Sequence, residues 1–191
     1  MRVANTLTGA RLVLSPVFFV AFFWSDWTGG AALFSAVLSV LCFVLIEVSD
    51  LLDGQIARRT GTVSDVGKLL DPLADSLSRL TYFVCFTAIG IMPVWVLLLV
   101  IYRDLGVAYL RVLAQRSGTT MGARFTGKLK AWVYGFAGIA GVLRSLDLRG
   151  LISGAPSVIL FRVSAAAFVA CAGIAVGSLI DYLIPVLTSQ D

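Results

Sequence analysis

The densest run of aspartates in this chain consists of two short segments. They read Asp50-Leu-Leu-Asp53-Gly54-Gln-Ile-Ala57-Arg58 and Gly67-Lys-Leu-Leu-Asp71-Pro-Leu-Ala-Asp75. The aspartates of the first segment are three residues apart and those of the second are four apart, so each pair lies on one face of its own helix. If the two helices form a hairpin through the Arg59–Val66 loop, the four carboxylates converge. The spacing therefore predicts two adjacent helices that share an acidic site.

The sequence around these segments is too apolar for a water-soluble domain. Hydrophobic residues make up 59% of the 191 residues and charged residues only 14%, and the mean hydropathy is +0.94. A soluble domain carries about a quarter of charged residues, so too few polar side chains are present to cover a globule in water. The composition predicts an all-α integral membrane protein.

Six stretches qualify as membrane-spanning helices, each of which needs about 20 apolar residues. They are Arg11–Trp24, Ala31–Ala57, Lys68–Gly90, Pro93–Ala114, Lys128–Leu146 and Ala155–Leu187. Ahead of the first, Met1–Ala10 is predicted to form a short helix along the membrane interface. No second domain or repeat is visible, so residues 1–191 are predicted to form a single membrane domain.

The basic residues predict the orientation. The first and third gaps between the spans carry no Lys or Arg, whereas the second and fourth are flanked by Arg58, Arg59, Lys68, Arg111, Arg116, Arg124, Lys128 and Lys130. The positive-inside rule then places both termini and the acidic site on the cytoplasmic side, which in a bacterium means the inner membrane. Three residues oppose this orientation: Arg144, Arg149 and Arg162. Arg11 interrupts the first apolar run, so we expect no cleaved signal peptide.

Charge and residue types restrict the chemistry. The net charge of +4 is small and lies next to the spans, which suits anionic lipid head groups and not nucleic acid. The chain has no histidine, and Cys42, Cys85 and Cys171 are isolated, so neither a zinc site nor a disulfide is expected. Carboxylates at membrane depth need a counter-charge, and oxygen ligands select hard cations such as Mg²⁺ or Mn²⁺. A surface ion-pair network is the alternative.

The two segments resemble the signature of the CDP-alcohol phosphotransferases, D-x2-D-G-x2-A-R-x8-G-x3-D-x3-D, at every fixed position. The six-helix layout extends the resemblance over nearly the whole chain. It implies a homodimer of six-helix subunits with two divalent metal ions in a cavity open to the cytoplasm. The implied metal ligands are Asp50, Asp53, Asp71 and Asp75. The implied contacts to the CDP-lipid come from Asn5, Thr8, Gly54, Ala57, Arg58 and Gly67.

The resemblance also implies a reaction. A two-metal site clamps the attacking and leaving oxygens of an in-line displacement, so that an alcohol attacks the β-phosphorus of a CDP-lipid and CMP leaves. Without a histidine in the chain, an aspartate must accept the proton, and Asp75 is implied as this general base. Arg58 is placed to bind the diphosphate, while Gly54 and Ala57 leave room on one helix face.

Four further elements resemble the phosphatidylglycerophosphate synthases within that family. These are Asn5-Thr-Leu-Thr8-Gly-Ala-Arg11 followed by Pro16, Asp71-Pro-Leu-Ala-Asp75, Gly127-Lys128-Leu-Lys130 and Tyr182-Leu183. Their donor is CDP-diacylglycerol, and an acceptor phosphate such as that of sn-glycerol 3-phosphate is predicted to pair with cations. The predicted acceptor site consists of Arg111, Lys128, Lys130 and Tyr182.

Other interpretations remain open. Three residues depart from the synthase pattern, namely Ser76, Ala131 and Tyr134, so an inositol phosphate, serine or another alcohol is an alternative acceptor. Lys128 and Lys130 also lie where positive-inside anchoring alone would place them. Intramembrane carboxylates build ion pathways too, so a transporter of protons or divalent cations is the rival from another class, and a scaffold without catalysis is a third.

Overall fold

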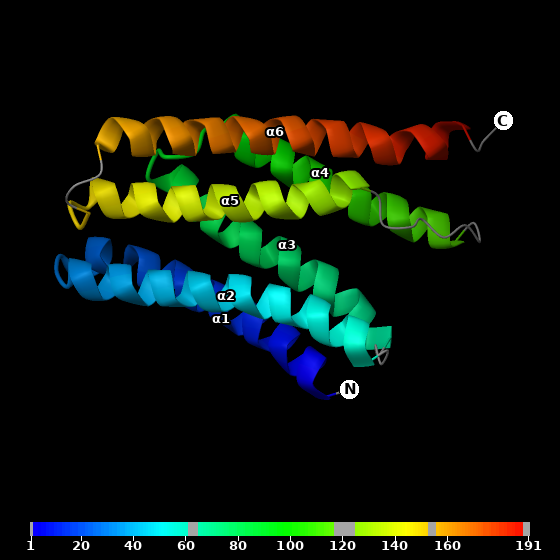
Figure 1. Ribbon diagram of the computed structural model, residues 1–191, viewed down its shortest axis with the longest axis horizontal. Helices are drawn as coiled ribbons and strands as arrows, with labels where there is room; N and C mark the ends of the chain where they lie inside the picture. Colours follow the sequence, from blue (N-terminus) through cyan, green and yellow to red (C-terminus); the bar gives the residue numbers. More distant parts are fainter. Residues whose placement is uncertain (1, 61–64, 117–124, 153–155, 189–191) are drawn as a thin grey trace. The chain divides into compact units, whose positions relative to one another are not determined.

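All regular structure in the described part of the chain is α-helical. The computed structural model describes the backbone of residues 2–60, 65–116, 125–152 and 156–188, and the side chains of residues 8–52, 70–113, 125–152 and 156–184. Its six helices are α1 (Arg2–Thr28), α2 (Ala32–Thr60), α3 (Asp65–Ala88), α4 (Val94–Arg116), α5 (Phe125–Leu148) and α6 (Ser157–Thr188), shown in Figure 1. The predicted all-α class is therefore confirmed.

The N-terminal prediction needs a correction. One continuous helix, α1, includes the described residues 2–10 of the predicted interfacial segment Met1–Ala10 and the whole of the predicted span Arg11–Trp24. In the structure the Arg11 side chain is only 2% exposed, and Asp50 meets its charge inside the fold. The helix continues past Arg11 without a break, and the guanidinium has a partner within the protein.

In the part of the chain that the structure describes, three helices are long and apolar enough to cross a membrane. Among the described residues, the candidate spans are Thr8–Thr28, Ala32–Leu52 and Ser157–Ile184. The other three helices have 24, 23 and 24 residues, which gives each a length of about 35 Å at 1.5 Å per residue. They are therefore long enough to span as well, but their apolar runs contain more charged side chains.

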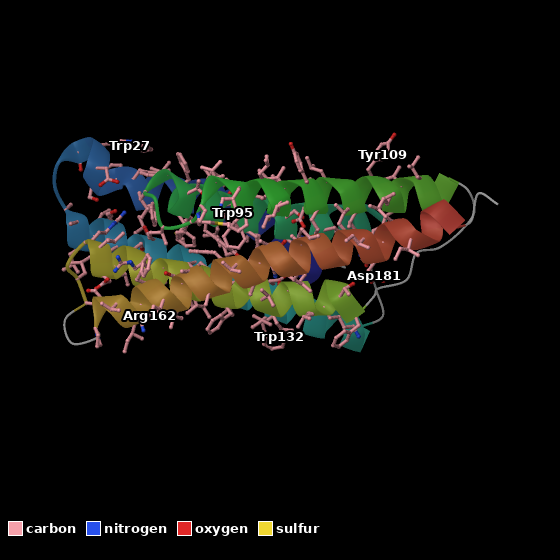
Figure 2. All side chains as sticks on the ribbon, turned by 90° about the horizontal axis from the view of Figure 1, so that it is seen from above. Trp27, Trp95, Tyr109, Trp132, Arg162 and Asp181 are labelled. Carbon is pink, nitrogen blue, oxygen red and sulfur yellow. The ribbon has the colours of Figure 1, made fainter. Side chains whose placement is uncertain are left out.

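The surface is far more apolar than that of a water-soluble protein, although the core is apolar as well. Large apolar side chains face outward, among them Trp27 and Trp132, which are labelled in Figure 2 and are 61% and 73% exposed. Charged side chains such as Arg103 and Lys130 are buried. Exposed apolar surface of this extent suits contact with lipid. Together with the apolar helices, it identifies an integral membrane protein.

The chain forms two compact units. Unit 1 comprises Met1–Cys85 and Leu148–Ser153, and unit 2 comprises Phe86–Asp147 and Gly154–Asp191. In unit 1, α1 and α2 pack side by side. A tight turn joins them, in which Gly29 has a φ of 68° and Ala31 a φ of 56°. Glycine adopts this left-handed conformation without steric cost, whereas it strains alanine.

Aromatic rings of α1, α2 and α3 form the core of unit 1. The buried ring of Tyr82 meets Phe43 edge-on at 5.4 Å and Phe18 at 6.5 Å between ring centroids. Arg149, from the connection between α5 and α6, also packs within this unit and binds to α1 and α2. Its Nη1 donates to Ser35 Oγ at 3.0 Å, its Nη2 donates to the Phe22 carbonyl, and its guanidinium stacks 4.8 Å from the Phe22 ring.

Unit 2 contains the packed pair α4 and α6 together with α5. A Cβ at Gly141 would overlap the ring of Phe86, so α5 approaches the end of α3 closely because this residue is glycine. Arg144 pairs with Asp147, and Ser157 Oγ donates to Asp147 Oδ1 at 2.8 Å. Arg144 and Arg149, which oppose the positive-inside pattern, thus both have partners within the protein.

Candidate active site

All four predicted aspartates belong to unit 1, and the three whose side chains the structure describes converge on buried arginines. Asp50 comes from α2, and Asp71 and Asp75 come from α3. Their side chains are 33%, 37% and 30% exposed, so each carboxylate is open on one side. The arginines approach from the protein interior: Arg11 of α1 is 2% exposed, and Arg79 of α3 is 5% exposed.

Acidic and basic groups alternate through this cluster. Arg11 Nη1 lies 2.7 Å from Asp50 Oδ1, and Arg11 Nη2 lies 3.5 Å from Asp71 Oδ1. Arg79 Nη2 lies 3.1 Å from Asp50 Oδ2, and Arg79 Nε lies 2.8 Å from Asp75 Oδ1. The sequence of contacts is therefore Asp71, Arg11, Asp50, Arg79, Asp75. We call these five residues the aspartate–arginine cluster.

Helical spacing brings the members together. Asp71, Asp75 and Arg79 follow one another at intervals of four, so they lie along one face of α3. A polar stripe on α1 meets them. Its members include Thr8 and Ser15; the Thr8 hydroxyl donates to Asp71 Oδ1, and Ser15 Oγ contacts Ser78 Oγ at 3.1 Å. Thr8, predicted as a contact to the CDP-lipid, is thus held against a predicted metal ligand.

The remaining predicted residues of this site lie outside the described side chains. They are Asn5 on α1, Asp53, Gly54, Ala57 and Arg58 on α2, and Gly67 on α3. Their roles stay predictions.

The donor atoms of the cluster suit a hard cation. Partly exposed carboxylate oxygens are the ligands that Mg²⁺ and Mn²⁺ prefer. Among the described side chains, however, no three acids form a group that could hold a metal ion. Arg11 and Arg79 lie between the carboxylates, and the fourth predicted ligand, Asp53, is not among those side chains. The oxygen ligands of these residues suit a hard cation by their chemistry, but their arrangement does not define a position for the ion.

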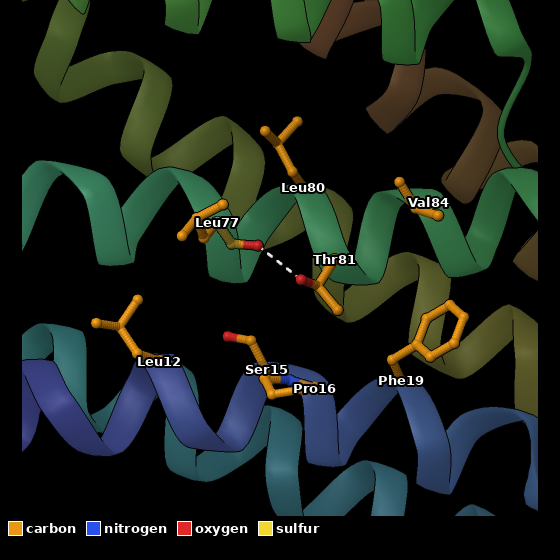
Figure 3. Close-up of a pocket in the computed structure, with 8 residues that line it drawn as sticks. All are labelled: Leu12, Ser15, Pro16, Phe19, Leu77, Leu80, Thr81 and Val84. Carbon is orange, nitrogen blue, oxygen red and sulfur yellow. Dashed lines mark hydrogen bonds between the residues drawn. The ribbon is translucent and has the colours of Figure 1, made fainter.

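An apolar groove lies beside the cluster. It has a volume of about 380 Å³ and is lined by Leu12, Ser15, Pro16 and Phe19 of α1 and by Leu77, Leu80, Thr81 and Val84 of α3, as Figure 3 shows. The Thr81 hydroxyl donates to the Leu77 carbonyl at 2.7 Å, so its polar atom is satisfied within α3. The groove therefore presents hydrocarbon surface next to the acidic residues.

Unit 2 brings together two residues of the predicted acceptor site. Arg111 Nη2 donates to the Tyr182 hydroxyl at 2.9 Å, and the guanidinium lies 5.3 Å from the centre of the Tyr182 ring. A Cβ at Gly127 would lie 3.4 Å from the same hydroxyl, so the first turn of α5 also approaches this pair. Lys128, the next residue, is exposed.

Lys130, the fourth predicted acceptor residue, is engaged elsewhere. Its Nζ lies 2.7 Å from Asp104 Oδ1 and 4.9 Å from the centre of the Tyr134 ring. Arg103 Nη1 lies 3.0 Å from the same Asp104 oxygen, and Arg103 Nε donates to Ser178 Oγ at 2.9 Å. We call Arg103, Asp104 and Lys130 the buried triad. It joins α4 to α5 and, through Ser178, to α6.

Sequence reasoning did not assign Arg79, Asp104, Glu47 or Tyr82 to any site. Tyr82 donates to Glu47 Oε1 at 3.2 Å behind the aspartate–arginine cluster. Spacing carried a usable signal for Arg79, which follows Asp75 by four residues, and for Glu47, which precedes Asp50 by three. For Asp104, the sequence offered only an acid next to Arg103 within a mostly apolar helix.

Comparison with known proteins agrees with these observations. The family model for CDP-alcohol phosphatidyltransferase matches residues 1–176. A CDP-diacylglycerol–glycerol-3-phosphate 3-phosphatidyltransferase of Treponema pallidum is 36% identical over 157 residues, 79% of this chain and 71% of that protein. One of the same name from Bacillus subtilis is 30% identical over 151 residues, 76% of this chain and 78% of that protein. A cardiolipin synthase (CMP-forming) of Streptomyces coelicolor is 36% identical over 104 residues, 54% and 47% of the two chains.

Proposed function

We propose a specific reaction for this chain, starting from the fact that it belongs to the CDP-alcohol phosphatidyltransferase family and is a membrane-bound transferase. The proposed reaction moves a phosphatidyl group from CDP-diacylglycerol to sn-glycerol 3-phosphate and releases CMP. The observation that carries it is the convergence of the family's aspartates, Asp50, Asp71 and Asp75, on two buried arginines. The names of the Treponema and Bacillus relatives support the choice of acceptor.

The residues of the aspartate–arginine cluster would perform the chemistry. Two Mg²⁺ or Mn²⁺ ions held by Asp50, Asp53, Asp71 and Asp75 would neutralise the diphosphate. The acceptor hydroxyl attacks the β-phosphorus, the bond from that phosphorus to the bridging oxygen breaks, and CMP leaves with the electron pair. Asp75 accepts the hydroxyl proton, since the chain has no histidine to do so. Arg79 holds one oxygen of Asp75 in place.

The acceptor phosphate would be bound in unit 2. Arg111 offers a guanidinium already oriented by the Tyr182 hydroxyl, and Lys128 adds an exposed ammonium group. A dianionic phosphate makes charge-assisted hydrogen bonds with both groups. A neutral alcohol such as inositol would leave these cations unused. Lys130 contributes less in this proposal, because Asp104 already pairs with it.

We also propose that all six helices span the membrane, with both termini and the active site on the cytoplasmic side and two chains forming a homodimer. Buried ion pairs support the spanning of α4 and α5: Asp104 and Lys130 neutralise each other inside the protein, so their charges do not face lipid. The basic residues that flank the cytoplasmic gaps support the orientation.

An acceptor panel tests the proposed reaction. The purified protein in lipid nanodiscs receives labelled CDP-diacylglycerol, Mg²⁺ or Mn²⁺, and one acceptor: sn-glycerol 3-phosphate, inositol phosphate, inositol, serine or phosphatidylglycerol. We expect CMP release and a new phospholipid with glycerol 3-phosphate and little with the others. Preference for another acceptor would overturn this choice. The absence of CMP release with every acceptor, combined with cation flux across vesicles, would favour the transporter.

A further inference from the structure

Arg79 connects two aspartates that come from different helices. Its Nη2 lies 3.1 Å from Asp50 Oδ2 on α2, and its Nε lies 2.8 Å from Asp75 Oδ1 on its own helix, α3. The side chain is 5% exposed, whereas both carboxylates are about a third exposed. The guanidinium thus holds the two acids from the interior and leaves their outer sides open.

The chemistry of arginine is required for this contact. A guanidinium is planar and donates from several nitrogens in fixed directions, so one side chain can orient two carboxylates at once. A lysine in the same place would keep the charge, but its single ammonium group has no fixed fork. The angle between the carboxylates of Asp50 and Asp75 therefore depends on the guanidinium itself and not only on its charge.

The surroundings of Arg79 restrict its movement. Glu47 and Tyr82 interact with it electrostatically, and the Tyr82 hydroxyl donates to Glu47. The Tyr82 ring is fully buried against Phe18 and Phe43. An aromatic core thus supports the polar residues behind the guanidinium, which keeps Arg79 and the two carboxylates in one arrangement.

We infer that Arg79 is a positioning residue of the active site: it fixes the relative orientation of Asp50 and Asp75 and thereby sets the affinity of the site for divalent cations and the rate of the transfer step. This inference rests on the proposed function, in which both aspartates are metal ligands and Asp75 is the base. Substitution of residues that orient metal ligands typically costs 10–100-fold in metal affinity or activity.

The test is Arg79→Lys, which keeps the charge and removes the fork. Three quantities are measured: the dissociation constant for Mn²⁺ by electron paramagnetic resonance without substrates, kcat and KM for both substrates, and the thermal unfolding midpoint. We expect Mn²⁺ binding weakened by about tenfold and kcat lowered by about 10–100-fold, with the KM for glycerol 3-phosphate little changed.

The matched control is Arg149→Lys. Arg149 is another arginine of unit 1 whose guanidinium makes two hydrogen bonds and stacks on a ring, and it contacts Ser35 and Phe22 but no aspartate of the cluster. We expect this variant to unfold at a lower temperature while Mn²⁺ affinity and kcat stay at the wild-type level. If Arg79→Lys behaved like this control, the inference would be overturned, because Arg79 would then serve stability alone.

The remaining outcomes are also decisive. Arg79→Gln, which keeps one amide NH₂ group and loses the charge, is a second variant and should weaken Mn²⁺ binding as well. If neither variant folded, Arg79 would belong to the fold and not to the site, and the inference would fall. A wild type that binds Mn²⁺ but prefers another acceptor would overturn the proposed reaction alone. A wild type that binds no Mn²⁺ would overturn both.

Discussion

The aspartate–arginine cluster of unit 1 and the buried triad of unit 2 use the same ion-pair chemistry with opposite exposure. In unit 1 the arginines are buried, while the side chains of Asp50, Asp71 and Asp75 are 30–37% exposed. In unit 2 the acid itself is enclosed: Asp104 is 3% exposed, and its partners Arg103 and Lys130 are 7% and 6% exposed. The carboxylates of the aspartate–arginine cluster are thus exposed enough to bind a ligand, whereas Asp104 contacts only side chains of the protein.

The difference has an energetic consequence. Charges in a buried pair lose their hydration, and removal of one partner typically costs about 3–5 kcal/mol because the other charge is left alone. The buried triad should therefore matter for stability. In the aspartate–arginine cluster, each carboxylate is exposed to water on one side. Loss of a carboxylate there should therefore lower stability less and lower turnover more. Substitutions in the two regions test this contrast.

The largest effect is expected for Asp71→Asn. The amide keeps the shape but removes a charged ligand, and metal-ion catalysis contributes several kcal/mol, so turnover should fall by about 10³-fold or more while the protein stays folded. CMP release and the unfolding midpoint measure the two effects, and a chelator should reproduce the loss reversibly. Asp26→Asn, at an exposed aspartate of α1, is the control. Normal turnover by Asp71→Asn would exclude the proposed metal site.

Next in size is Asp75→Asn. A positioned base typically contributes about 10²–10⁴-fold, so kcat should fall within that range while CDP-diacylglycerol binding changes little. Kinetics and a lipid-binding assay check this, and the Mn²⁺ dissociation constant is measured alongside because Asp75 is also a proposed ligand. Retention of near-normal turnover would show that another group accepts the proton.

Asp104→Asn tests the other half of the comparison. We expect a stability loss of about 3–5 kcal/mol, since Arg103 and Lys130 would lose the charge between them, together with a smaller effect on turnover than Asp71→Asn. The double variant Asp104→Asn with Lys130→Met should recover part of the loss. Unfolding midpoints measure both. A stable Asp104→Asn protein that has lost activity would instead place Asp104 in the chemistry.

The smallest effects are expected at the proposed acceptor site. Charge-assisted hydrogen bonds contribute roughly 1.5–3 kcal/mol each, so Lys128→Ala should raise the KM for glycerol 3-phosphate by about one to two orders of magnitude. Tyr182→Phe, which removes a neutral partner of Arg111, should raise it by only a few fold. The KM for CDP-diacylglycerol serves as the internal control. An unchanged acceptor KM in Lys128→Ala would mean that this lysine only anchors the loop.

The spacing of the aspartates carried most of what could be predicted. The interval of four residues places Asp71 and Asp75 on one face of α3, and the structure brings them together with Asp50. The interval of three between Asp50 and Asp53 involves a side chain outside the described ones, so that part stays a prediction. Apart from the ends of α1, helix ends were predicted closely; for example, the predicted span Pro93–Ala114 corresponds to α4, Val94–Arg116. Aspartate spacing and helix ends depend on the local sequence, so a single amino-acid sequence is enough to predict them.

Partner choice could not be predicted, because it depends on contacts between distant residues. Arg11 was interpreted as an interruption of an apolar run, yet it pairs with Asp50, which lies 39 residues away. Lys130 was assigned to the acceptor phosphate, yet it contacts Asp104 on another helix. Arg149 contradicted the orientation rule because that rule counts charges and ignores their partners.

Arg149 also has a consequence for the order in which the molecule is assembled. The hydrogen bond from Arg149 to Ser35 joins residues 114 positions apart, and Leu148–Ser153 belongs to the same compact unit as the first helices. At a synthesis rate of about 5–20 residues per second, roughly 6–23 s separate the emergence of the two partners. The N-terminal part of unit 1, Met1–Cys85, therefore leaves the ribosome before its last segment, Leu148–Ser153, has been synthesised. Unit 1 is completed only after most of unit 2 has been made.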